Sequence, residues 1–127
     1  MTDKNKIYEF DPQIYPRLLW ITVGCSLDVI REKFGKDFPE MDKDACADTC
    51  RAHTKTPKER GGILIRFASK KEITYENVCH EAGHAAIEIF DYCGCCIAEN
   101  NQEPFTYLQG WVAKCCKEVK DGKAKAL

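Results

Sequence analysis

The segment His80-Glu81-Ala82-Gly83-His84 contains two of the three histidines in the chain, four residues apart. In a helix, the two imidazoles would lie one turn apart on the same face, where both can reach a single Zn²⁺ ion. Glu81 would then lie beside a metal-bound water, whose pKa the ion lowers towards about 7, and could take its proton. The resulting hydroxide can attack a carbonyl polarised by the same ion, so the spacing predicts a hydrolytic zinc centre.

A helix over residues 74–92 would place this cluster on one surface. Thr74 can cap its start, and Gly94 can end it. At about 100° per residue, the apolar and small residues share one arc of the helix. The polar arc on the opposite side holds His80, Glu81, His84 and Glu88. We therefore expect the helix to bury one face and to expose a His/Glu cluster on the other.

The two histidines need a further ligand, because a catalytic zinc normally has three protein ligands and one open position. Glu103 is our candidate, since the 18 residues between it and His84 allow a second helix to lay its first turn beside the metal. Three alternatives remain open for this position: Glu88, Glu99 and His53. Tyr107 would share a helix face with Glu103, and its hydroxyl could donate to a substrate oxyanion.

Together, these residues resemble the gluzincin branch of the zincin metallopeptidases. The resemblance covers about Gly61 to Trp111, and "EPFTYLQGW" is similar to small single-domain zincin-like proteins of bacteria and phages. It implies a minimal zincin-like fold and a zinc peptidase, in which the metal ligands are His80, His84 and Glu103 and the general base is Glu81. One departure is Tyr107, which stands where large gluzincins have an aspartate that supports the first histidine.

The resemblance also implies where a substrate would bind. In zincins, the strand before the helix holds an extended peptide by backbone pairing at the sheet edge. Here that strand is Ile63–Phe67. An ordinary core strand is the alternative interpretation of the same residues.

The nine cysteines suggest a second kind of site. Cys93 and Cys96 form a C-x-x-C pair, and with Cys115 and Cys116 they could make a thiolate zinc site or a redox pair. A thiolate could also occupy the open zinc position and silence the enzyme. However, the cysteine count is odd, no second C-x-x-C follows, and neighbouring helical cysteines point about 100° apart. We therefore interpret most of them as reduced thiols that pack as small hydrophobes.

Composition limits the remaining possibilities. With 44% hydrophobic and 31% charged residues, the chain has the composition of a globular domain, and 127 residues fit one domain. A net charge of −1 provides no overall field for nucleic acid or an anionic membrane. The polar start "MTDKNKIYEF" lacks the apolar core of a signal peptide, so we expect a cytoplasmic protein without a membrane segment. The oligomeric state is left open.

The remaining elements predict an α+β domain. "RLLWITV" is typical of a buried strand, and Ser26 can cap a helix that ends at Gly35. Residues 46–55 and the strand "ILIRFA" would form a hairpin, joined by the turn-rich "TPKERGG". A last helix would begin at Asn100 or Asn101 with Pro104 in its first turn, and residues 120–127 would fray. This order predicts a mostly antiparallel sheet with the zinc helix and the C-terminal helix packed on it.

The sequence is compatible with three functions. The first is a zinc peptidase that acts on a peptide or protein substrate. The second is a catalytically inactive zincin-like module that binds a partner. The third is a cysteine-based metal or redox protein.

Overall fold

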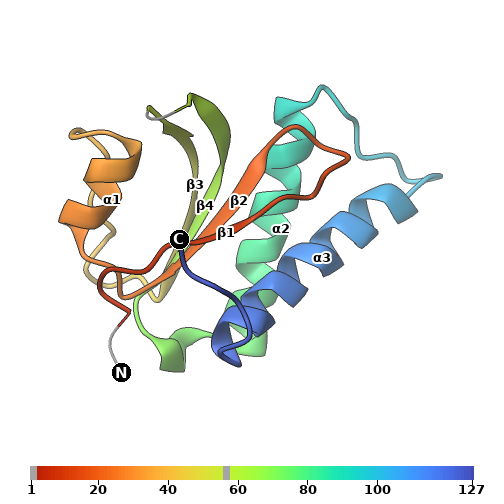
Figure 1. Cartoon of the computed structure of the whole chain (residues 1–127). Helices are drawn as coiled ribbons and strands as arrows, with labels where there is room; N and C mark the ends of the chain where they lie inside the picture. Colours follow the sequence, from red (N-terminus) through yellow and green to blue (C-terminus); the bar gives the residue numbers. More distant parts are fainter. Residues whose placement is uncertain (1–2, 56–57) are drawn as a thin grey trace.

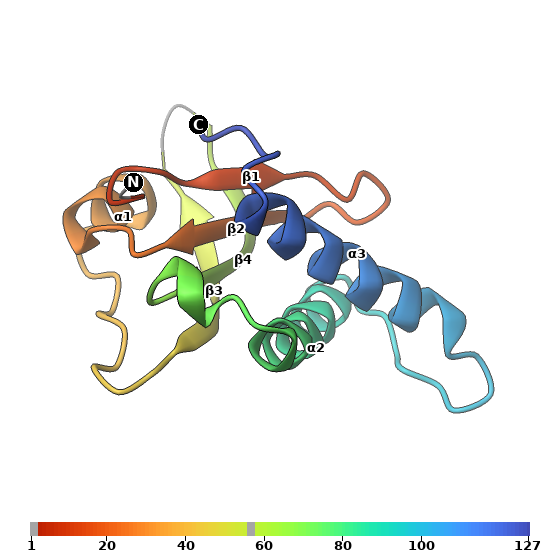
Figure 2. The same ribbon diagram turned by 90° about the horizontal axis from the view of Figure 1, so that it is seen from below.

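A four-stranded sheet with helices on both faces organises the chain (Figure 1). The computed structural model describes residues 3–55 and 58–127. In chain order the elements are β1 (Tyr8–Phe10), β2 (Leu18–Val23), α1 (Leu27–Phe34), β3 (Ala47–Thr54), β4 (Arg60–Phe67), a 3₁₀ helix (Lys70–Glu72), α2 (Tyr75–Tyr92) and α3 (Glu103–Lys120). Helix α1 covers one face of the sheet, and α2 and α3 lie side by side on the other (Figures 1 and 2).

The strand order is β1-β2-β4-β3. β2 and β4 run parallel, whereas β1 with β2 and β3 with β4 are antiparallel. The predicted α+β class with a mostly antiparallel sheet is therefore confirmed. None of the helices in the described part combines the length and the apolar character that a bilayer crossing requires.

β2 and β4 form the centre of the core because both of their faces are covered. Strands buried on both sides are continuous apolar runs, and all six residues of β2 are buried. Alternate side chains separate into two clusters, one under α2 and α3 and one under α1. Leu19 and Ile63 belong to the first cluster, and Trp20 and Leu64 to the second.

Of the two interpretations of Ile63–Phe67, the sheet edge was wrong and the core strand is confirmed. Leu18–Val23 of β2 pairs with β4 on one side, and Ala47–Thr54 of β3 pairs with it on the other. β4 therefore uses its backbone groups in both directions, and its apolar residues suit this interior place. The edge strand on this side is β3, whose exposed Arg51 and His53 are typical of a solvated edge.

The ends of the helices follow their capping residues. Thr74 Oγ1 accepts from the Asn77 backbone N–H at 3.1 Å, and Ser26 caps α1 in the same way. The predicted hairpin is confirmed as β3 and β4, but the first residues of its turn, Thr56 and Pro57, lie outside the described part. α3 begins at Glu103, later than predicted, after an isolated bridge that pairs Ala98 with Asn101.

The predicted fraying of residues 120–127 was also wrong. Ala126 forms an antiparallel bridge with Tyr8, and the Leu127 backbone N–H donates to the Ile7 carbonyl at 2.8 Å. Figure 2 shows this tail beside β1. Backbone pairing orders the segment although its side chains are mostly exposed.

Gly61 and Gly62, the second and third residues of β4, give a matched pair for testing the central packing. A Cβ at Gly62 would overlap the Leu18 carbonyl oxygen and lie 2.8 Å from Cζ3 of Trp20, whereas at Gly61 the nearest heavy atom would be 3.6 Å away. We expect Gly62→Ala to lower the free energy of unfolding by about 2–3 kcal/mol, because buried overpacking forces backbone shifts. Gly61→Ala should change it by less than about 1 kcal/mol. Urea denaturation measures both, and equal effects would contradict the tight approach at Gly62.

Candidate metal centre

His80 and His84 lie on the solvent-facing side of α2 and direct their rings to one point. Their Nε2 atoms are 3.1 Å apart, and their ring centroids are 4.7 Å apart. Two nitrogen ligands of a tetrahedral zinc, each at about 2.0–2.1 Å, are separated by about 3.3–3.4 Å. The pair thus fits two positions of a zinc site with little movement. The same distance also suits a hydrogen bond between a protonated and an unprotonated ring nitrogen.

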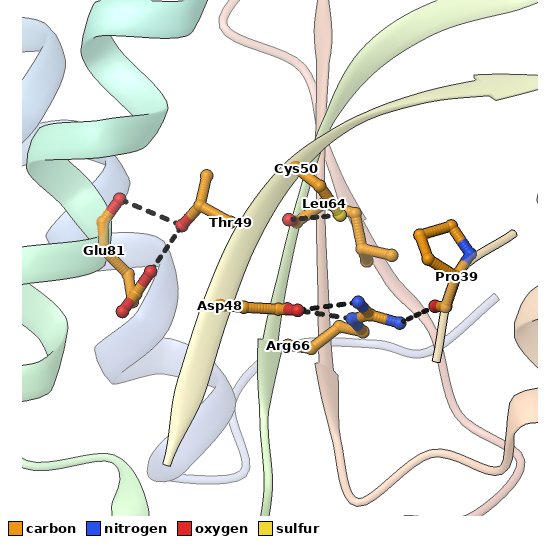
Figure 3. Close-up of polar contacts among 7 residues, drawn as sticks. All are labelled: Pro39, Asp48, Thr49, Cys50, Leu64, Arg66 and Glu81. Atoms are coloured by element: carbon orange, nitrogen blue, oxygen red, sulfur yellow. Dashed lines mark hydrogen bonds and ion pairs between the residues drawn. The ribbon is translucent and has the colours of Figure 1, made fainter. Parts of the chain in front are cut away.

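Glu81 lies between α2 and the edge strand β3. Its side chain is buried, with 6% of the residue exposed, and its Oε1 accepts from Thr49 Oγ1 at 2.8 Å (Figure 3). The Thr49 hydroxyl also lies 3.4 Å from the Glu81 backbone carbonyl. Because Glu81 is about 100° further around the helix than His80, it faces the sheet while the histidines face solvent. The edge strand therefore fixes the direction of the Glu81 carboxylate, one residue after His80.

The structure does not bring Glu103 to the histidines. α2 and α3 are antiparallel. The ring centroids of Phe90 and Phe105 are 5.4 Å apart, and a Cβ at Gly83 would lie 3.5 Å from the side-chain nitrogen of Gln109. The part of α3 level with the histidines is thus near Gln109. Glu103 is six residues earlier, about 9 Å along the helix axis. Over residues 3–55 and 58–127, no three His, Cys, Asp or Glu side chains form a group that could hold a metal.

Glu88 is one turn beyond His84, but it is engaged with the edge strand. The Arg51 guanidinium of β3 forms ion pairs with both Glu88 and Asp91. Its Cζ atom lies 4.3 Å from the centroid of the Tyr92 ring. Hydrogen bonds with Glu88 and then Asp91 raise the pKa of Arg51. This network joins the free edge of β3 to α2, and it keeps the Glu88 carboxylate directed at Arg51.

The other two alternatives have surroundings of their own. His53 is near the end of β3, and its Nε2 is 3.0 Å from Oε1 of Glu59. Glu99 lines a hollow of about 240 Å³ with Phe105 and Thr106, in the connection between α2 and α3. Neither residue joins a three-ligand group within the described part of the chain.

Tyr107 lies on a different flank of α3. It is 74% exposed and lines a hollow of about 440 Å³ with Tyr15, Leu108 and Trp111, facing the β1–β2 connection. The α2-facing flank of α3 instead carries Gly110 and Ala113, which share a groove with residues of α2. The predicted oxyanion donor is therefore not brought to the histidines.

The cysteines are all free thiols. Cys115 and Cys116 belong to α3 and are buried in the core, where burial raises the pKa of each thiol to about 12. Cys95 and Cys96 are exposed after α2. In the predicted C-x-x-C, Cys93 is half-buried against the core and Cys96 is exposed, and the described residues do not assemble these thiols with Cys115 and Cys116 into a thiolate site.

Thr49 is the site residue that sequence reasoning missed. It stands in the alternating segment Asp48-Thr49-Cys50-Arg51, where every second side chain faces α2. Once the register of the hairpin is known, with Thr49 opposite Ile65, its direction follows. The alternation could have identified the face, but not the helix residue that the hydroxyl meets.

Comparison of the chain with protein-family models, with curated proteins and with solved structures gives no match in any of the three. Three features of the chain's own geometry therefore bear on its function. They are the histidine pair, the buried glutamate and the free edge of β3.

The contact between Thr49 and Glu81 predicts a measurable effect on stability. We expect Thr49→Val to lower the free energy of unfolding by about 1–3 kcal/mol, because it leaves the buried carboxylate without its donor. Thr49→Ser keeps the hydroxyl and is the matched control, with a smaller loss. Guanidinium denaturation measures both variants. If valine and serine cost the same, the hydroxyl contributes nothing to the position of Glu81.

Proposed function

We propose that this chain binds Zn²⁺ through His80 and His84 and hydrolyses peptide bonds with Glu81 as general base. The observation that carries the proposal is the 3.1 Å separation of the two Nε2 atoms on an exposed helix face, with a buried carboxylate one residue after the first histidine. A bound zinc would supply Lewis-acid activation of water and of a carbonyl. The resemblance to zincins supports the same assignment.

The environment of Glu81 suits a base that must be held still. Its Oε1 is occupied by the Thr49 hydroxyl, whereas Oε2 accepts no hydrogen bond from the described residues. One oxygen is therefore fixed and the other is available to take a proton from water. A carboxylate positioned by a hydrogen bond loses less freedom when it acts.

The free edge of β3 provides a place for an extended substrate. Its outer backbone groups have no strand partner in the described part, and Thr49 places this edge next to Glu81. A peptide that adds to β3 as a further strand would run past the exposed side of α2. The proposed binding edge therefore moves from Ile63–Phe67 to Ala47–Thr54, one strand outward.

A second candidate is a module that binds such peptides without cleaving them. The absence of Glu103 from the histidine pair favours it, because a catalytic zinc normally has three protein ligands. The two candidates share the edge strand and the histidines. They differ only in whether Glu81 transfers a proton.

Zinc titration tests the ligand set. We expect about one zinc per chain, at least about tenfold weaker binding in His80→Ala and His84→Ala, and unchanged binding in Glu103→Ala. Competition with a chromophoric chelator gives the affinities, and circular dichroism confirms that each variant is folded. Unchanged binding in both histidine variants would refute the site. A loss in Glu103→Ala equal to that of the histidine variants would restore the three-ligand prediction.

Glu81→Gln tests the proposed base. The glutamine carbonyl can still accept from Thr49, so we expect the fold and the zinc affinity to be kept. Turnover of a peptide library should fall by about a hundred- to ten-thousand-fold. Mass spectrometry of the library measures cleavage by wild type and variant. Cleavage at the wild-type rate would exclude Glu81 as base, and peptide binding without cleavage by wild type would establish the binding module.

A further inference from the structure

A second surface feature lies between the first half of α2 and the second half of α3. It is a groove of about 450 Å³, which we call the α2–α3 groove. Its lining includes Val78 and Cys79 from α2 and Gly110 and Ala113 from α3. The small α3 residues leave the space open, because a Cβ at Gly110 would have no heavy atom within 4 Å. The floor of the groove is therefore apolar and accessible.

One rim of the groove is a row of lysines. Lys114, Lys117 and Lys120 follow at intervals of three residues, so their charges extend over about 9 Å of α3. Lys117 Nζ is 2.6 Å from Oδ2 of Asp121, the one carboxylate among the lining residues that the structure describes. Lys114 and Lys120 form no ion pair with any described residue. The rim thus has unbalanced positive charge.

We propose that the α2–α3 groove binds an acidic amphipathic helix of a partner protein. An apolar floor beside a row of cations is complementary to a helix with apolar residues on one face and carboxylates along its border. Carboxylates at positions i, i+3 and i+7 of such a helix span about 10 Å, which matches the lysine row. A small ligand with one carboxylate would use only one lysine.

The opposite rim supports a macromolecular partner. Tyr75, at the start of α2, is 94% exposed although it lines the groove. An exposed aromatic side chain beside an apolar floor provides contact area at a low cost in side-chain entropy. A third helix laid between α2 and α3 would cover Tyr75, Val78 and Ala113 together. The proposal uses none of the histidines and does not depend on zinc.

A designed peptide tests the charge match. The probe is a fluorescein-labelled 18-residue peptide with leucines on one helical face and glutamates on the other, and its binding is measured by fluorescence anisotropy. We expect Lys114→Glu/Lys120→Glu to weaken binding at least about tenfold at low salt. Lys36→Glu/Lys43→Glu is the matched control, because it makes the same charge change at two exposed lysines outside the groove. Equal losses in the two double variants would overturn the proposal.

A filled groove tests the location. Gly110→Leu has room for its Cβ, and leucine is a better helix former than glycine, so the fold should be kept. We expect it to abolish peptide binding and to leave the zinc affinity unchanged. Undiminished peptide binding by this folded variant would overturn the proposal. Equal binding of a scrambled peptide without an apolar face would also overturn it. The same holds if laurate or anionic vesicles bind at the groove and the peptide does not.

Discussion

The enclosure of β4 between β2 and β3 is the constraint on which the rest of the structure depends. β4 contributes apolar side chains to both faces of the sheet, and α2 follows it in the chain after the 3₁₀ helix. The parallel pairing with β2 requires Gly62, because any side chain there would meet the Leu18 backbone. With β4 in the centre, β3 is the outer strand on that side of the sheet. α2 follows β4 in the chain and contacts β3 through its polar side chains.

The seam between β3 and α2 then holds two polar contacts that differ in burial. Half-buried Thr49 meets the buried side chain of Glu81. Further along, Arg51 joins Glu88 and Asp91 at the surface. Exposed ion pairs contribute little to stability, whereas a buried carboxylate needs its hydrogen bond. The contact of the buried carboxylate therefore contributes more to the joining of β3 and α2 than the exposed ion pairs do.

The sequence predicted local features well and long-range ones poorly. The helix over residues 75–92 was predictable because a capping threonine precedes a clear apolar arc, and the strand after Gly61 and Gly62 because a double glycine precedes β-branched residues. The strand order was not predictable, since it depends on pairing between β2 and a strand some forty residues later. The place of Glu103 depends on the contact between Phe90 and Phe105, which no periodicity reveals. The tail is held by backbone hydrogen bonds. Because these do not depend on the type of side chain, they leave no pattern in the sequence.

The pairing of the C-terminal tail with β1 has a practical consequence for the architecture. The Leu127 backbone N–H donates to the Ile7 carbonyl, so the C-terminal residue lies beside the segment that leads into β1. This contact lies at the β1 edge of the sheet, and β3 with its contacts to α2 forms the opposite edge. A short linker could join Leu127 to this segment, and the chain could be reopened in a surface loop, as in circular permutation.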